Sequence, residues 1–302
     1  MQHLRVAAIT FIAAGAVFWL VGLGTYAGLK AVVAHSPFRL AVATNAARFA
    51  GQTINLVVGD SRLMDGVNAE QINTARGRVV VFNAAFNGIE YPEALTVVEA
   101  FVQTCQCHLG KVLIDETALW EETPGVSETE AFLAAFDAAA EERLSLRDPR
   151  RARILEIFPA IHFNNEVTLR SLYYLAAGTS DQDHGNTYRF RVPKNKTATI
   201  GTTAKVNHLN ADDVAAMVRK VEAAGGSLLV VVPPHHPAYT EGRVGFTDYI
   251  ASVRKEVLEA GAGFQDDSRH FVDRPDVFSD LIHLHVDGQY LYSRYLMERV
   301  FQ

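Results

Sequence analysis

Short apolar runs alternate along most of the chain with longer segments of mixed polarity. The apolar runs predict five buried strands, at 54–59, 79–82, 112–114, 228–232 and 263–265. Apolar residues also recur at helical spacing, which predicts helices at 92–107, 212–224, 246–260 and 288–301. Strands that alternate with helices favour a parallel sheet with right-handed crossovers, so the expected fold is α/β, a flavodoxin-like three-layer sandwich.

One long segment breaks this alternation. Helical patterns at 128–146 and 151–177 are followed by a polar loop at 178–207 before the strand and helix pattern resumes. We interpret residues 118–210 as a helical insertion over the strand ends, where it would serve as a lid or as a surface for a partner.

The amino end has a different character. No residue from Val6 to Leu29 is charged, and this run exceeds the roughly 20 apolar residues that span a bilayer. A cleaved signal peptide has an apolar core of only about 7–15 residues, so we expect an uncleaved transmembrane helix. The predicted domains are therefore a membrane anchor with a juxtamembrane segment at 1–50 and a globular domain at 51–302.

Composition and charge narrow the possible partners. The chain has 302 residues, of which 49% are hydrophobic, enough for one large α/β domain or two small ones. Residues 1–59 hold four Lys or Arg and no Asp or Glu, which leaves 24 basic and 34 acidic residues, a net charge of −10, in the remainder. Such an acidic domain argues against a nucleic-acid partner.

The sequence contains two cysteines, Cys105 and Cys107. They lie two positions apart at the end of a predicted helix, where their side chains would point away from each other. Neither a disulfide framework nor a zinc site is therefore expected, and both are interpreted as packing residues.

The first predicted strand ends in Gly59-Asp60-Ser61-Arg62, a tight turn before a helix. A serine at this place lies at the carboxyl edge of the sheet, where open α/β sheets bind ligands. The free backbone N–H groups of the next helix can stabilise a developing negative charge there. The alternative is that Ser61 only caps the helix, as Asp and Ser commonly do.

Four further candidates also follow predicted strands: Gly88, Asp115, His235 and His283. Parallel strands would bring all of them to the same edge as Ser61. Near the carboxyl end, Asp280-Leu-Ile-His283 places a carboxylate three residues before a histidine, just ahead of the closing helix.

The Gly-Asp-Ser turn and the terminal Asp-x-x-His block together resemble the SGNH/GDSL hydrolase superfamily, over roughly residues 54–300. The resemblance implies that Ser61 is the nucleophile, that His283 is its base and that Asp280 orients the imidazole ring, as in other triads. It implies no metal and no cofactor.

The resemblance also implies an oxyanion hole that uses the backbone N–H groups of Ser61 and Gly88. The family's usual third donor is an asparagine after the third strand, but this chain has Asp115-Glu116-Thr117 there. Asn87 or Thr117 could substitute.

Several polar residues at the strand ends are candidates for substrate binding: Arg62, Asp115, Thr117, His235 and His236. For His235 and His236 an alternative stays open, because the prolines that flank them are typical of a polar turn with no other role.

The acyl-enzyme allows two outcomes, hydrolysis by water or transfer to a sugar hydroxyl. The membrane segment, the Gly-Asp-Ser-Arg turn, the Pro-Pro-His-His-Pro loop and the insertion resemble membrane-linked SGNH-like proteins of bacterial polysaccharide O-acetylation. That resemblance implies a polysaccharide acceptor, an acyl donor, and a membrane-bound O-acyltransferase as partner. It also implies a single-pass protein of the inner membrane with a periplasmic domain. The flanking charges do not set the orientation themselves, because Arg5, Lys30 and Arg39 are distributed too evenly on the two sides of the helix.

Two other classes of function stay open. One is a noncatalytic scaffold that binds glycan or recruits partners at the membrane. The other is a metal-dependent hydrolase with Asp60, His283 and His285 as ligands, since Asp and His are ordinary metal ligands.

Overall fold

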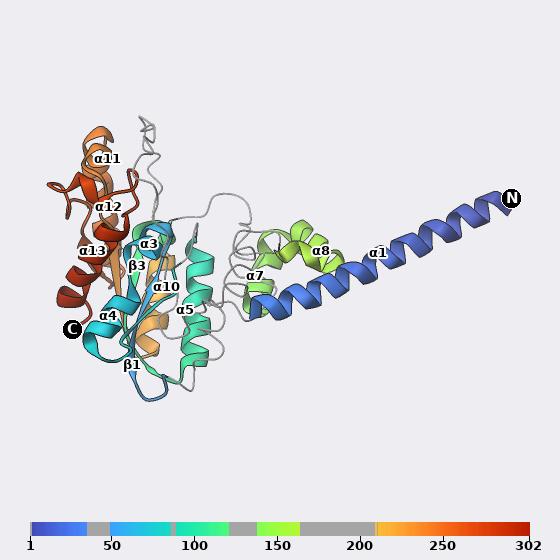
Figure 1. Ribbon diagram of the computed structural model, residues 1–302, viewed down its shortest axis with the longest axis horizontal. Helices are drawn as coiled ribbons and strands as arrows, with labels where there is room; N and C mark the ends of the chain where they lie inside the picture. Colours follow the sequence, from blue (N-terminus) through green and yellow to red (C-terminus); the bar gives the residue numbers. More distant parts are fainter. Residues whose placement is uncertain (1, 35–48, 86–88, 121–137, 164–208, 210) are drawn as a thin grey trace. The chain divides into compact units, whose positions relative to one another are not determined.

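The computed structural model describes residues 2–34, 49–85, 89–120, 138–163, 209 and 211–302 of the chain (Figure 1). The chain divides into two compact units. The first unit comprises residues 1–39 and 124–180, and the second unit comprises residues 40–123 and 181–302.

A five-stranded parallel sheet forms the centre of the second unit. Its strands are β1 (Thr53–Val58), β2 (Val81–Asn83), β3 (His108–Asp115), β4 (Ser227–Val232) and β5 (Gly263–Asp266). The spatial order is β2-β1-β3-β4-β5, and every neighbouring pair is parallel. This order is that of flavodoxin-like doubly wound sheets, so the predicted fold class is confirmed.

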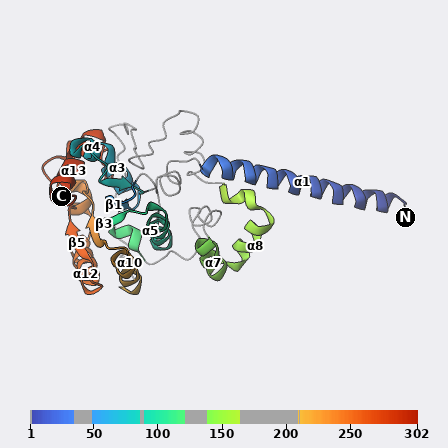
Figure 2. The ribbon, with the colours of Figure 1, turned by 90° about the horizontal axis from the view of Figure 1, so that it is seen from below.

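Helices cover both faces of the sheet. One layer contains α3 (Ser61–Gly66), α4 (Ala69–Arg76) and α13 (Val286–Arg299), in which α13 contacts both of the other helices. The other contains α5 (Tyr91–Cys105), α10 (Ala211–Ala223) and α12 (Phe246–Glu259). Figure 2 shows the sheet between these two layers. Short elements complete the unit: η1 (Glu116–Leu119), α11 (Pro237–Gly242) and η3 (Pro275–Val277).

The strands are apolar on both sides because both faces of the sheet are covered. In β1, Leu56, Val57 and Val58 are all fully buried, although consecutive side chains point to opposite faces. An uninterrupted apolar run that ends abruptly at a polar turn therefore marks a central strand, and this one delivers Gly59-Asp60-Ser61 to the carboxyl edge of the sheet.

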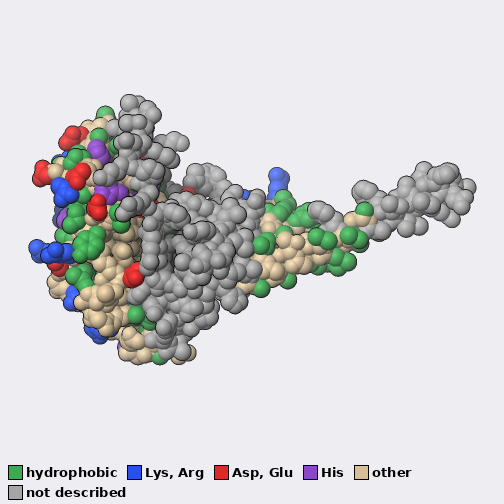
Figure 3. All heavy atoms as spheres, in the orientation of Figure 1, with side chains coloured by type: hydrophobic (Ala, Val, Ile, Leu, Met, Phe, Trp, Pro, Cys, Tyr) green, Lys and Arg blue, Asp and Glu red, His purple; other side chains and the backbone are tan. Residues whose placement is uncertain are grey.

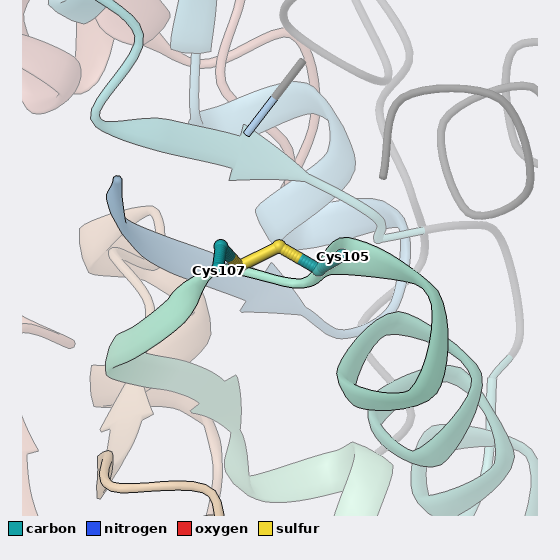
Figure 4. Close-up of a disulfide and its surroundings, with 2 residues drawn as sticks. All are labelled: Cys105 and Cys107. Carbon is teal, nitrogen blue, oxygen red and sulfur yellow. A yellow bond between two sulfur atoms is a disulfide. The ribbon is translucent and has the colours of Figure 1, made fainter. Parts of the chain in front are cut away.

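The prediction for the two cysteines is wrong. Cys105 and Cys107 form a disulfide (Figure 4). Helix α5 ends at Cys105, and Gln106 adopts a left-handed conformation with φ of 48° before β3 begins at His108. The prediction placed both residues on a continuing helix, whereas the turn at Gln106 brings their Cα atoms to 5.0 Å and turns the side chains toward each other.

The first unit is helical in its described part. It contains α1 (Gln2–Ala34), α7 (Ala138–Arg147), α8 (Pro149–Ile157) and η2 (Pro159–Phe163). Helices α7 and α8 agree with the helical character expected of the insertion. The rest of the predicted insertion, residues 121–137, 164–208 and 210, lies outside the described residues.

The amino-terminal segment forms a single helix, α1, that spans the uncharged run. Within the described part of the chain, no helix combines the length and the apolar character that a membrane crossing requires. The expected transmembrane helix thus gains no support from the structure.

Candidate active site

Ser61 is positioned by the turn between β1 and α3. Asp60 is the N-cap residue of α3, and its Oδ1 accepts a hydrogen bond of 2.8 Å from the backbone N–H of Arg62. Gly59 is required by a close approach, because a Cβ atom at this position would lie 3.0 Å from the Asp115 carboxyl group and 2.9 Å from Leu63. The turn thus packs directly on the end of β3.

His283 and Asp280 lie in the loop between η3 and α13. The Ser61 Oγ atom lies 2.7 Å from Nε2 of His283, and Nδ1 of His283 lies 2.8 Å from Oδ2 of Asp280. The other carboxylate oxygen of Asp280 accepts the backbone N–H groups of Ile282 and His283, at 2.9 and 2.8 Å. The structure therefore brings together the three residues that the motifs single out, although 222 positions separate the serine from the histidine.

The electrostatics of the pair suit a base and its orienting carboxylate. Burial alone would lower the pKa of His283, but the hydrogen bond and charge of Asp280 outweigh it and raise that pKa above its ordinary value. Burial alone would raise the pKa of Asp280, yet its hydrogen bonds to His283 and Ile282 lower it to about 2. Asp280 is therefore ionised at neutral pH, and it fixes the tautomer in which Nε2 of His283 accepts a proton.

The loop after β4 supports the histidine loop. The backbone N–H groups of His235 and His236 donate to the carbonyl oxygens of Ser268 and Leu281, each at 3.0 Å. The His236 ring caps α11, since its Nδ1 accepts the N–H of Ala238. His235 is only 2% exposed, which favours the alternative of a structural turn for that residue. His236 is partly exposed, so its contact with substrate stays a prediction.

The substrate-binding roles expected for Arg62 and Asp115 also need correction. Both side chains are buried, and they face each other rather than an open surface. Arg62 pairs with Glu116 at 2.8 Å, and Glu116 is a residue that the sequence analysis did not assign to any role. The sequence does carry a signal for this pairing, because three acidic residues stand at strand ends and one arginine follows the first of those strands. It does not show that these side chains are buried, since burial depends on tertiary packing.

Two of the residues expected to contribute to an oxyanion hole, Ser61 and Thr117, lie in the described part of the chain. The backbone N–H of Ser61 belongs to the first turn of α3, whose N–H groups have no partner within the helix. The hydroxyl of Thr117 donates to Oδ2 of Asp60 at 2.8 Å, so it is not free to serve as the third donor. Asn87 and Gly88 lie outside the described residues.

His285, the third ligand of the hypothetical metal site, is used differently. It is the N-cap of α13, where its Nδ1 accepts the N–H of Asp287 at 3.0 Å, and its Nε2 lies 2.5 Å from the carbonyl oxygen of Asp276. Both ring nitrogens therefore have partners. Among the described residues, no group of three His, Cys, Asp or Glu side chains is arranged to hold a metal ion.

The site occupies the carboxyl edge of the sheet, the end of the second unit at which α11 follows β4. On this side of the molecule, histidine and acidic side chains come to the surface together near α11 and α12 (Figure 3). The predicted gathering of strand-end residues at one edge is thus found for the described residues.

No protein-family model matches the chain, and no curated protein matches it. The solved structures that resemble it include a catalytic mutant of an acetylxylan esterase from Geobacillus stearothermophilus, with 11% identity and a TM-score of 0.40 over 84% of this chain and 96% of that one. Another is a lipase/acylhydrolase from Enterococcus faecalis, with 10% identity and a TM-score of 0.41 over 82% and 95%. Values this low carry no argument about activity, which depends on the side chains at the site.

Proposed function

We propose that this protein is a serine-dependent acyl ester enzyme of the SGNH/GDSL type. The observation that carries the proposal is the continuous contact from Ser61 through His283 to Asp280, with heavy-atom distances of 2.7 and 2.8 Å. A serine hydroxyl is a poor nucleophile until a base takes its proton, and a positioned base contributes about 10²–10⁴-fold in rate.

The reaction follows from these contacts. Nε2 of His283 takes the proton of the Ser61 hydroxyl as Oγ attacks the ester carbonyl carbon, and Asp280 stabilises the imidazolium that forms. The tetrahedral intermediate collapses, the bond to the leaving alcohol breaks, and His283 gives that alcohol its proton. An incoming water or sugar hydroxyl then loses a proton to His283 and attacks the carbonyl carbon of the acyl-enzyme. The bond from that carbon to Ser61 Oγ breaks, and His283 returns the proton to Oγ.

A chromogenic acetyl ester tests this proposal. We expect the full chain to hydrolyse p-nitrophenyl acetate, with Ser61→Ala and His283→Ala each lowering turnover about 10³-fold or more. Ser252→Ala is the matched control, because the Ser252 hydroxyl bonds only to Glu256 on α12. A fluorophosphonate should label Ser61 in the wild type. Normal turnover by Ser61→Ala, or the absence of both turnover and labelling in the wild type, would contradict the proposal. The second outcome would favour the scaffold, to which the missing asparagine after β3 also points.

We further propose that the acyl group is acetyl and that the acceptor or substrate is a bacterial envelope or extracellular polysaccharide. The support is the motif resemblance, because fold does not fix an acceptor. Acetyl transfer that requires an added glycan identifies a transferase working with an acyl donor and a membrane-bound O-acyltransferase. Hydrolysis that is independent of the glycan identifies an esterase.

For location, we propose attachment to the bacterial inner membrane through the amino-terminal segment, with the second unit in the periplasm. The uncharged run at 6–29 supports attachment. The Cys105–Cys107 disulfide supports an oxidising compartment, where such bonds persist. Recovery of the full chain in the membrane fraction after carbonate washing, together with digestion of the second unit by protease added to spheroplasts, is expected. Recovery in the cytosolic fraction contradicts this location.

A further inference from the structure

A cluster of polar side chains, four of them buried and two partly exposed, lies directly beneath the Ser61 turn. Its members come from that turn and from the ends of β3 and β4: Asp60, Arg62, Asp115, Glu116, Thr117 and His235. A charge that is buried without a partner lowers the stability of the folded protein by roughly several kcal/mol. Such a group is therefore expected only where its partners are in place. Packing alone does not account for the cluster, because apolar side chains could fill the same space without this cost.

The guanidinium of Arg62 is the centre of the cluster. Its Nε lies 3.2 Å from both carboxylate oxygens of Asp60, and its Nη1 donates to Glu116 Oε1 at 2.8 Å. Its Nη2 donates to the hydroxyl of Thr117 and lies 3.5 Å from Asp115. All three nitrogens of one planar group thus face acceptors on segments far apart in the sequence, a geometry that arginine offers and lysine does not.

Two further bonds fix the turn to the end of β3. The Thr117 hydroxyl donates to Oδ2 of Asp60 at 2.8 Å, and the backbone N–H of Asp60 donates to Oδ2 of Asp115 at 3.0 Å. The other oxygen of Asp115 accepts the N–H of Ala118 at 3.1 Å. Asp60 and Arg62 flank the serine on either side, so the serine backbone is held at both ends.

The directions of the pKa shifts agree with an ion pair between Arg62 and Asp60 within the network. Burial alone would raise the pKa of Asp60, but the charge of Arg62 keeps it below its usual range. Burial raises the pKa of both Asp115 and Glu116. The charge of Arg62 thus keeps Asp60 ionised, whereas for Asp115 and Glu116 the cost of burial outweighs the attraction of the same guanidinium.

We propose that Arg62 is a positioning residue for the nucleophile: by joining Asp60 to the ends of β3 and β4, it holds the Ser61 hydroxyl within reach of His283. The inference rests on the proposed function, because it assigns a role at the same site. The histidine arrives on a separate loop, so the 2.7 Å contact depends on how rigidly the serine turn is held from below. A displacement of about 1 Å in such a constellation can cost about 10²-fold in rate.

A purely structural role predicts a different result. Loss of packing or pairing would lower stability, while each folded molecule would keep its turnover. A positioning role lowers kcat in folded protein and leaves KM nearly unchanged, because the Arg62 side chain is buried and acts on the serine turn rather than on bound substrate.

The experiment compares four full-length proteins: wild type, Arg62→Lys, Thr117→Val and Arg254→Met. Arg254→Met is the control, since Arg254 is exposed on α12. Thr117→Val keeps the shape of the side chain, removes the hydroxyl bridge between Arg62 and Asp60, and leaves every charge in place. It therefore preserves the test if Arg62→Lys fails to fold. Thermal denaturation establishes folding, and p-nitrophenyl acetate gives kcat and KM.

We expect kcat to fall about 10²-fold in Arg62→Lys and about tenfold in Thr117→Val, with KM within about twofold of wild type and no change in Arg254→Met. A kcat within about threefold of wild type in folded Arg62→Lys overturns the proposal. If Arg62→Lys does not fold, an unchanged kcat in Thr117→Val overturns it.

A crystal structure separates this inference from the proposed function. If the wild type proves inactive and unlabelled, the function fails, but the distance from Ser61 Oγ to His283 Nε2 can still be measured in Thr117→Val. A distance beyond hydrogen-bonding range supports positioning by the cluster. An unchanged contact overturns it.

Discussion

His283 is controlled by two opposing effects. Burial disfavours its protonated form, whereas the ionised Asp280 favours that form by hydrogen bonding and by charge, and the second effect prevails. The same carboxylate that orients the ring therefore makes it a stronger base. The rate of the proposed reaction should therefore depend on pH.

We predict that kcat/KM falls as the pH is lowered through a midpoint above 6.5, because a protonated imidazole cannot accept the Ser61 proton. In Asp280→Asn the largest effect that raises the His283 pKa is gone while burial remains, so the midpoint should move to lower pH than in the wild type, with activity reduced by roughly 10⁴-fold. Rates of p-nitrophenyl acetate hydrolysis between about pH 5 and 9, the range in which histidine titrates, measure both midpoints.

Asp276→Asn is the control, because the Asp276 carboxylate is exposed and pairs with Arg274 on the surface. It should leave the midpoint in place. A wild-type midpoint at or below 6.5 would show that burial, not Asp280, dominates the titration of His283.

At the scale of single residues, the sequence indicates that Ser61, Asp280 and His283 come together, but it does not indicate the role of Arg62. Asp280 and His283 lie within three positions, so local chain geometry keeps them together, and the parallel sheet brings Ser61 to the same edge. The role of Arg62 cannot be inferred in this way, since an arginine beside a serine is ordinarily a solvated side chain. Its burial depends on acceptors contributed by Glu116 and Thr117, which only the fold places around it.

Among the elements, α13 is held to the sheet by a buried carboxylate at the end of β5. Asp267 accepts hydrogen bonds from the hydroxyls of Tyr292 and Tyr295, at 2.9 and 3.0 Å, and from the amide of Gln265 at 2.6 Å. Burial nevertheless raises its pKa. Because α13 follows His285 directly, this contact also anchors the loop that carries His283.

We predict that Tyr292→Phe lowers the free energy of unfolding by about 1–3 kcal/mol, since it removes a donor from a buried carboxylate and leaves the ring in place. Tyr290→Phe on the same helix should change it by less than about 0.5 kcal/mol, because Tyr290 is 57% exposed. Urea denaturation followed by circular dichroism gives both values. Equal effects from the two substitutions would contradict an anchoring role for the Asp267 contact.

Element boundaries show where the sequence loses information. The apolar spacing correctly indicates the helix near 92–107, but α5 ends at Cys105 and β3 begins at His108. The reason is Gln106, whose positive φ is uncommon for a residue other than glycine and leaves no mark in the sequence. The disulfide escaped prediction for the same reason.

At the scale of the whole molecule, the sheet and the candidate site belong to one compact unit. Every strand in the described part of the chain lies in the second unit, as do Ser61, Asp280 and His283. The alternation of strands and helices predicts this arrangement, because each crossover joins neighbours in sequence. The grouping of residues 124–180 with residues 1–39 could not be predicted, since contacts between helices distant in sequence leave no periodic signal.

This division predicts that a chain beginning at Leu40 keeps the esterase activity proposed for the full chain. No described sheet or site residue lies within residues 1–39, and those residues belong to the first unit, so their removal should destabilise contacts such as that between α1 and η2 and spare the second unit. We expect kcat/KM within about threefold of the full chain, or ~0.7 kcal/mol in activation free energy. The truncated Ser61→Ala protein controls for contaminating esterase. A loss of turnover beyond tenfold in a shortened chain that retains its cooperative unfolding transition would show that the amino-terminal segment contributes to catalysis, and the site could no longer be described from the second unit alone.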